Sequence, residues 1–253
     1  AISGIAIGTV VLPILSKTII NETQKKVFYI QNRSVELSVF LSAPAAVGII
    51  IGAEEIISCL FGYGSFNQES IHNTANALII FGFGLPAFSL LKLYSNFYFA
   101  RGDTNFPFRV SVFTVVGNIL ISLVYFKKYG FLSIAAGTSI SCWLAVFVYK
   151  FYLKKDKFHS SDKIFIERFS KIIATSLIIG GILYFQLFYF KEEFLTNEIS
   201  KVFYLFFIVF KASRIFIGNH MAFFAFALYF IILSYIFGRY NYKQERYIKL
   251  KDA

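Results

Sequence analysis

Charged side chains are scarce in this chain of 253 residues, in which Asp, Glu, Lys and Arg together make up 15%. Soluble domains contain about 25% charged residues. With 57% hydrophobic residues and a mean hydropathy of +0.64, the sequence lacks the polar side chains needed to cover the surface of a soluble fold. The shortage of charge excludes a soluble enzyme and a disordered chain, and it indicates a polytopic membrane protein.

Cysteines and catalytic motifs are also scarce. The two cysteines, Cys59 and Cys142, both lie in apolar runs, which is typical of small buried side chains and excludes a disulfide scaffold. No HExxH, CxxC, Walker-type or GxSxG motif occurs, and His72, His159 and His220 stand far apart in the sequence. Because a membrane enzyme needs converging acid–base or metal-binding groups, we expect no catalytic residue, no metal centre and no enzyme activity.

Long apolar runs, by contrast, are abundant. A membrane-spanning helix needs about 20 apolar residues, and the sequence predicts an all-α transmembrane bundle of about seven spans. The apolar runs are 1–15, 37–61, 75–100, 110–126, 130–149, 170–190 and 221–238. The first run is short for a span and opens at Ala1 rather than at a methionine, so we expect an N-terminal part of the protein to precede it.

Basic residues outnumber acidic residues by 25 to 14. In a membrane protein such an excess marks the cytoplasmic loops rather than a nucleic-acid partner. Four basic segments fall on one side of the predicted bundle: 16–36, 101–109, 150–171 and the tail after Gly238. We therefore expect a cytoplasmic tail. This topology places the apolar stretch 199–217, which Lys211 and Arg214 interrupt, along the membrane surface as an interfacial helix.

Lys92 is a candidate for binding an anionic substrate such as a pyrophosphate. It lies within the apolar run 75–100, and an ionisable group at that depth is costly and usually faces a water-filled cavity or a partner. A lysine side chain can also extend along the helix to the lipid headgroups. Both interpretations stay open.

Arg101 is the second substrate-binding candidate, nine residues after Lys92. It is placed either to contact a phosphate or to pair with Asp103 and hold the turn. Asp103 or Thr104 is suited to cap the following helix, and Pro107 fits the first turn of that helix. The segment therefore combines a structural cap with a candidate ligand.

Three polar residues form a candidate cation site. Asn118 and Ser122 are four positions apart in one predicted span and share a face, and Thr138 lies on the next span. Their oxygens would suit a small cation, but hydrogen bonds between helices are the commoner use of such residues in membranes.

Pro13, Pro44 and Pro86 all fall within apolar runs. Each removes a helix hydrogen bond and permits a kink. Kinked helices serve alternating access in transporters, although they also occur in other membrane bundles.

Four segments in the first 150 residues resemble one protein family, in order and with the right spacing. Gly4–Lys17 resembles the family segment GVALGTxLLPxLS(K/R), and Ala43–Gly48 resembles LPAAVG. Leu60–Phe66 and Tyr98–Pro107 resemble LFxxGxF and FYAxGDTxxP. The chain therefore resembles the C-terminal half of the MurJ (MviN) lipid II flippases, in the multidrug/oligosaccharidyl-lipid/polysaccharide exporter superfamily. Residues 151–253 match in hydropathy only.

The resemblance implies a fourteen-helix exporter of two lobes, of which this chain would contain helices 8 to 14. Residues 1–150 would be the C-terminal transporter lobe with its first helix truncated, and 151–169 a basic cytoplasmic loop. Residues 170–253 would hold the last two helices, the interfacial segment and the cytoplasmic tail. In the family, a groove between the last two helices is suggested to hold a lipid tail.

The resemblance also implies a function in peptidoglycan and cell-wall biosynthesis. The substrate would be lipid II, the undecaprenyl-linked peptidoglycan precursor, moved from the cytoplasmic to the periplasmic leaflet of the bacterial inner membrane by alternating access. The implied partners are this lipid, membrane lipids and the N-terminal lobe of the same protein, which carries most of the family's cavity arginines. Two alternatives stay open: a flippase for another polyprenyl-linked saccharide, such as O-antigen or teichoic acid, and a non-transporting scaffold for cell-wall enzymes.

The sequence departs from the family at several positions. Some relatives bind sodium between an Asn, an acidic residue four positions later and a Thr on the next helix. Asn118 and Thr138 match this pattern, but Ser122 replaces the carboxylate, and a neutral site holds a cation more weakly. Sodium and the membrane potential are both candidate energy sources, and no cofactor is expected. Tyr63 and Glu55 stand where many relatives have Arg and Pro.

Overall fold

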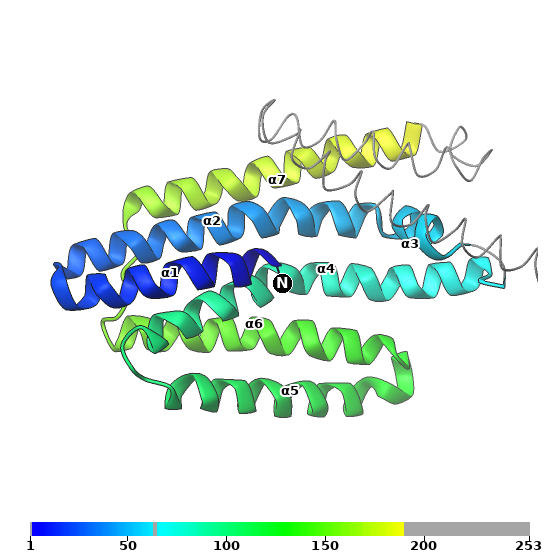
Figure 1. The fold of residues 1–253 in the computed structure, drawn as a ribbon. Helices are drawn as coiled ribbons and strands as arrows, with labels where there is room; N and C mark the ends of the chain where they lie inside the picture. Colours follow the sequence, from blue (N-terminus) through cyan, green and yellow to red (C-terminus); the bar gives the residue numbers. More distant parts are fainter. Residues whose placement is uncertain (1, 63–64, 190–253) are drawn as a thin grey trace, which may run out of the picture. The chain divides into compact units, whose positions relative to one another are not determined.

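The computed structural model describes residues 2–62 and 65–189, and all regular structure in these ranges is helical. Residues 1–184 form one compact unit, to which the following description applies. The helices are α1 (Ile2–Asn21), α2 (Gln24–Ile51), α3 (Ala53–Phe61), α4 (Gln68–Phe99), α5 (Asn105–Tyr129), α6 (Leu132–Lys155) and α7 (Lys163–Tyr189) (Figure 1).

Five of these helices are long and apolar enough to cross a membrane: α2, α4, α5, α6 and α7. In α1 the apolar helix within Ile7–Asn21 is shorter. The expected all-α transmembrane bundle is thus confirmed for the described residues. The predicted span 221–238 and the predicted interfacial segment 199–217 lie outside them.

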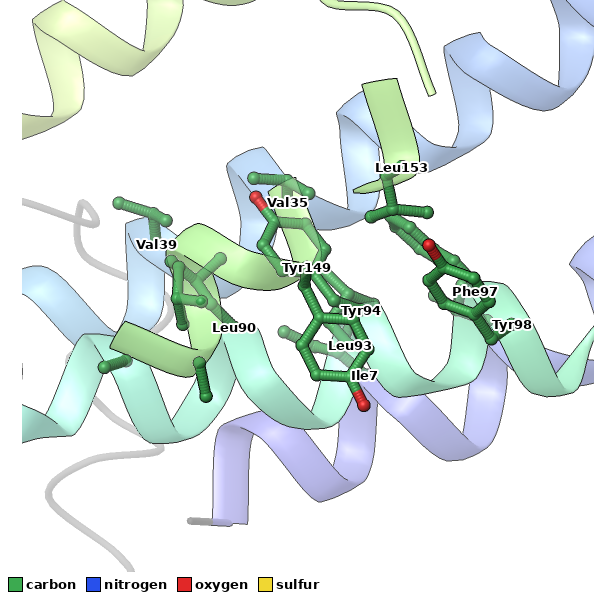
Figure 2. Packing of buried hydrophobic residues seen from close by; sticks show 14 of the residues in the cluster. Ile7, Val35, Val39, Leu90, Leu93, Tyr94, Phe97, Tyr98, Tyr149 and Leu153 are labelled. Carbon is green, nitrogen blue, oxygen red and sulfur yellow. The ribbon is translucent and has the colours of Figure 1, made fainter. Parts of the chain in front are cut away.

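Helix α4 is central, since it contacts α1, α2, α3, α5 and α6. Its buried residues Leu90, Leu93 and Phe97 recur at a spacing of three and four, which places them on one face of the helix. Figure 2 shows this face packed among side chains that include Val35 of α2 and Tyr149 of α6. The core therefore lies where α1, α2, α4 and α6 meet.

Helices α4 and α6 also approach closely through small and polar residues. A Cβ atom added to Gly84 would lie 2.6 Å from Ser139 Oγ. Near Pro86, Ser139 Oγ donates to the carbonyl of Ile80 (2.8 Å), and Trp143 Nε1 donates to the carbonyl of Phe83 (2.9 Å). Such packing is typical of helix pairs in membranes, where van der Waals contact and hydrogen bonds replace the hydrophobic effect between helices.

Several predicted boundaries are wrong. The predicted loop 16–36 is helical except at Glu22–Thr23, because its polar residues are compatible with helix; Lys26, for example, pairs with Glu22.

The predicted run 37–61 is divided at Gly52, where α2 ends and α3 begins. The predicted loop 150–171 shrinks to 156–162, since α6 and α7 extend beyond their apolar segments. Hydropathy identifies the membrane-embedded part of a helix, whereas backbone hydrogen bonds continue into its polar ends.

The three predicted kink positions all fall within helices. Pro13 lies in α1, Pro44 in α2 and Pro86 in α4, and each helix continues past its proline. Whether these positions act as hinges stays a prediction.

Candidate functional site

Lys92 lies on an exposed part of α4 beside α1, where a Cβ atom on Gly8 would be 4.0 Å from Lys92 Cγ. Within residues 2–62 and 65–189, the salt bridges involve other cations and leave Lys92 without a carboxylate partner. It is seven residues, or about 10 Å, from the C-terminal end of α4 at Phe99. A lysine side chain can cover much of that distance. The position of Lys92 is therefore compatible with both interpretations: its ammonium group could face a polar cavity, or it could extend to the lipid headgroups.

Arg101 is partly buried and is bonded to two backbone carbonyls from different parts of the chain. Its Nη1 donates to Phe97 O of α4 (2.6 Å), and its Nη2 donates to Phe158 O (2.8 Å). The guanidinium carbon also lies 4.4 Å from the centroid of the Phe158 ring. Burial lowers the pKa of Arg101 from its usual value. The guanidinium thus joins the end of α4 to the segment between α6 and α7, and it forms no salt bridge with Asp103 in the described structure.

Asp103 instead caps helix α5. Its Oδ1 accepts hydrogen bonds from the N–H groups of Asn105 (3.0 Å) and Phe106 (3.1 Å). Thr104 has a helical backbone conformation and makes no capping hydrogen bond with its side chain. Pro107 is buried as the third residue of α5, where a missing N–H leaves no helix hydrogen bond unformed. Gly102 has a φ of +79°, which favours glycine in this turn.

We predict that Asp103→Ala lowers the free energy of unfolding by about 1 kcal/mol, because two N–H groups at the start of α5 lose their acceptor. Thr104→Ala is the matched control and should change stability by less than about 0.5 kcal/mol. Thermal unfolding of the purified protein in detergent measures both. Equal losses in the two variants would contradict the assignment of Asp103 as the cap.

The 156–162 connection between α6 and α7 is fastened to α2 as well as to Arg101. Asn32 Nδ2 donates to Ser160 O (3.0 Å), and Gln24 Nε2 donates to Lys157 O (3.1 Å). Asp162 Oδ1 accepts from the N–H of Phe165 in the first turn of α7 (2.7 Å). The sequence suggested only a basic loop that orients the chain. Its docking depends on backbone carbonyls, which carry no signal in the residue pattern.

His159 lies at the centre of this connection. Its Nδ1 is 3.3 Å from Oε1 of the fully buried Gln31, and its ring is 6.0 Å from that of Phe97 between centroids. Burial, and secondarily the positive charges of Lys150 and Arg101, lower the pKa of His159 to about 4. In the sequence His159 looks isolated, because its partners Gln31 and Phe97 lie far away along the chain.

Glu36 is a second residue whose contacts no motif in the sequence indicates. It is mostly buried in α2, and its Oε2 accepts from Arg33 one turn earlier. Arg168 of α7 approaches the same oxygen to 3.8 Å. A carboxylate in an apolar helix is costly unless it is paired, so this cluster is a polar contact between α2 and α7.

The candidate cation residues are only partly brought together. Ser122 Oγ donates to Asn118 Oδ1 (3.1 Å), and both side chains pack against Gly137 of α6. Thr138 instead donates to the carbonyl of Ile134 in its own helix (2.8 Å). In the part of the chain that the structure describes, no group of three or more His, Cys, Asp or Glu side chains is arranged to hold a metal. The hydrogen bond between Asn118 and Ser122 therefore lies within α5, and the bonded pair forms a packing contact with α6 at Gly137.

Comparison with known proteins connects this fold with one family. The family model described as lipid II flippase MurJ matches residues 1–207. A Rickettsia prowazekii protein named probable lipid II flippase MurJ is 31% identical over 204 residues, which are 79% of this chain and 40% of that protein. A Rhizobium tropici protein of the same name is 31% identical over 180 residues, which are 71% of this chain and 34% of that protein.

The fold supports the same relationship. A solved structure of lipid II flippase MurJ in an inward closed conformation matches with a TM-score of 0.66 and 25% sequence identity. The match covers 85% of this chain and 43% of the solved chain. The chain thus spans less than half the length of these relatives. Because the family model matches most of the sequence and the helical fold agrees, this chain belongs to the MurJ family of lipid II flippases.

Proposed function

We propose that this chain is part of a transporter that moves lipid II from the cytoplasmic to the periplasmic leaflet of the bacterial inner membrane. The observation that carries the proposal is the family match over residues 1–207. The 0.66 TM-score to a solved flippase supports it. Membership of a transporter family, together with the absence of catalytic motifs from the sequence, favours transport over enzyme activity.

We also propose the finer assignments that the resemblance implies. The described helices would belong to the C-terminal lobe and work with an N-terminal lobe by alternating access, with the C-terminal tail in the cytoplasm. The hydrogen-bonded Asn118–Ser122 pair has no carboxylate and would hold a cation weakly. Sodium and the membrane potential are the two candidate energy sources. No cofactor is proposed.

Complementation tests this function. Cells depleted of their own flippase, and supplied with the complete protein that contains this chain, should recover lipid II in the periplasmic leaflet. Failure at normal abundance would contradict the proposal. Rescue of an O-antigen or teichoic-acid lipid flippase mutant instead would favour the alternative substrates.

Lys92→Ala separates transport from a scaffold role. If Lys92 contacts an anionic substrate from a polar cavity, its loss should reduce rescue at least about tenfold while abundance stays unchanged, as expected for loss of a charge-assisted contact of 1.5–3 kcal/mol. Lys127→Ala, an exposed lysine near the end of α5, is the matched control and should rescue normally. Normal rescue by Lys92→Ala would contradict substrate contact and leave Lys92 as a lysine that extends to the headgroups.

A further inference from the structure

The 156–162 connection joins α6 to α7 and is also attached to α2 and to the end of α4. Asn32 and Gln24 bind it to α2, and Arg101 binds it to the end of α4. It follows α6 directly, and Asp162 ends it by capping α7. Because these hydrogen bonds fix the short segment to α2 and α4, they also fix the position of the first turn of α7, which follows it directly.

The groups around His159 include more positive than negative charge. From α2 it faces the neutral amide of Gln31, and from α4 and α7 it faces the rings of Phe97 and Phe165, with centroids 6.0 and 6.5 Å away. The charged groups that act on it are Lys150 of α6, Arg101 after α4 and Asp162 of its own segment. Two cations thus oppose one carboxylate, so a proton on the imidazole would add a third positive charge to a largely buried site.

We propose that the 156–162 connection is a proton-sensitive lock, which fastens the start of α7 to α2 and α4 while His159 is neutral and releases it when His159 is protonated. This inference goes beyond the proposed transport function and does not depend on it. The Glu36–Arg168 contact and the packing of Gly180 against Val47 attach α7 to α2 elsewhere along its length. The lock therefore governs the start of α7 rather than the whole helix.

The direction of the pH effect follows from the docked pKa of about 4, which is below the usual value of 6.5 for histidine. A proton binds more tightly to the released segment than to the docked one. The docked state is therefore fully favoured above pH 6.5 and loses stability as the pH falls from 6.5 to about 4. Between pH 7.5 and pH 4.5 the ratio of docked to released molecules should fall on the order of 50-fold.

Distances between spin labels on the full protein test the lock. One label is attached at Ser161→Cys in the connection and the other at Lys26→Cys on α2, both exposed positions, with Cys59 and Cys142 replaced by alanine. We expect one narrow distance distribution at pH 7.5 and a second, broader population at pH 4.5. An unchanged distribution would overturn the proposal.

Two variants and one control pair make the result specific. His159→Gln, which stays neutral, should keep the narrow distribution at both pH values, and Lys150→Gln should reduce the released fraction at pH 4.5. Labels at Lys26→Cys and Arg109→Cys, outside the connection, should not respond to pH. If the control pair broadens equally, or if His159→Gln releases as the parent does, the lock is rejected.

Discussion

Replacing Gly137 with leucine should separate α5 from α6 and destabilise the fold by about 2–3 kcal/mol. A Cβ atom at this position would lie 2.5 Å from Ser122 Oγ and 3.0 Å from the backbone oxygen of Asn118. Side chains can rotate away, but a carbonyl within α5 cannot move without shifting the helix. Because α5 packs mainly against α6, the variant should also lose folded protein when it is extracted from membranes.

Gly48→Leu is the matched control for this prediction. Gly48 also lies within a helix, yet nothing approaches a Cβ atom there within 4 Å. This substitution should be neutral, or should stabilise α2 slightly through its higher helix propensity. The midpoint of unfolding in mixed detergent micelles compares the two variants. Similar losses from both would show that close contact at Gly137 is not the cause.

Replacing Arg101 with alanine should have the second large effect, a loss of about 2–4 kcal/mol of stability. The variant removes two charge-assisted hydrogen bonds, to Phe97 O and Phe158 O, and the stacking over the Phe158 ring. The carbonyl of Phe158 would lose this donor at a partly buried site. Thermal unfolding in detergent, with folded yield as a second measurement, should show the loss.

Arg101→Lys and Arg109→Ala complete the comparison. An ammonium group cannot supply the planar fork that reaches two carbonyls, so Arg101→Lys should recover less than half of the lost stability. Arg109 is exposed on α5, and its removal should change stability by less than about 0.5 kcal/mol. If Arg101→Ala unfolds like the parent but fails in transport, Arg101 is a substrate contact rather than a structural tie.

Hydropathy predicts where the helices of this chain lie, but it does not predict the residues at which they begin and end. Six of the seven predicted runs fall on described helices, because a span must be continuously apolar. The prediction of a loop at 16–36 is wrong, since polar residues that look solvated in the sequence lie in α1 and α2. In the structure, Gln31 and Asn32 are buried where the 156–162 connection docks onto α2.

In the candidate site, contacts between residues near in sequence could be predicted, whereas contacts between distant residues could not. The cap at Asp103 was foreseeable, because its partners are two and three residues away. The pairing of Asn118 with Ser122 was also foreseeable from their spacing on one helix. For Arg101 the sequence offered a phosphate or a nearby carboxylate as partner, whereas the structure provides two carbonyls, one of them 57 positions away.

The sequence by itself determined the class of the protein, its family and the helical spans within residues 2–62 and 65–189, because these depend on composition and on short motifs that can be read along the chain. The tertiary structure alone decided which polar groups meet. Asn32 and Ser160, for example, are 128 positions apart and belong to segments that both look like solvated loops. Their contact depends on how α2, α6 and α7 pack, and a backbone carbonyl offers the same acceptor whatever residue carries it. Local sequence therefore contains no record of the docked connection or of the surroundings of the histidine at its centre.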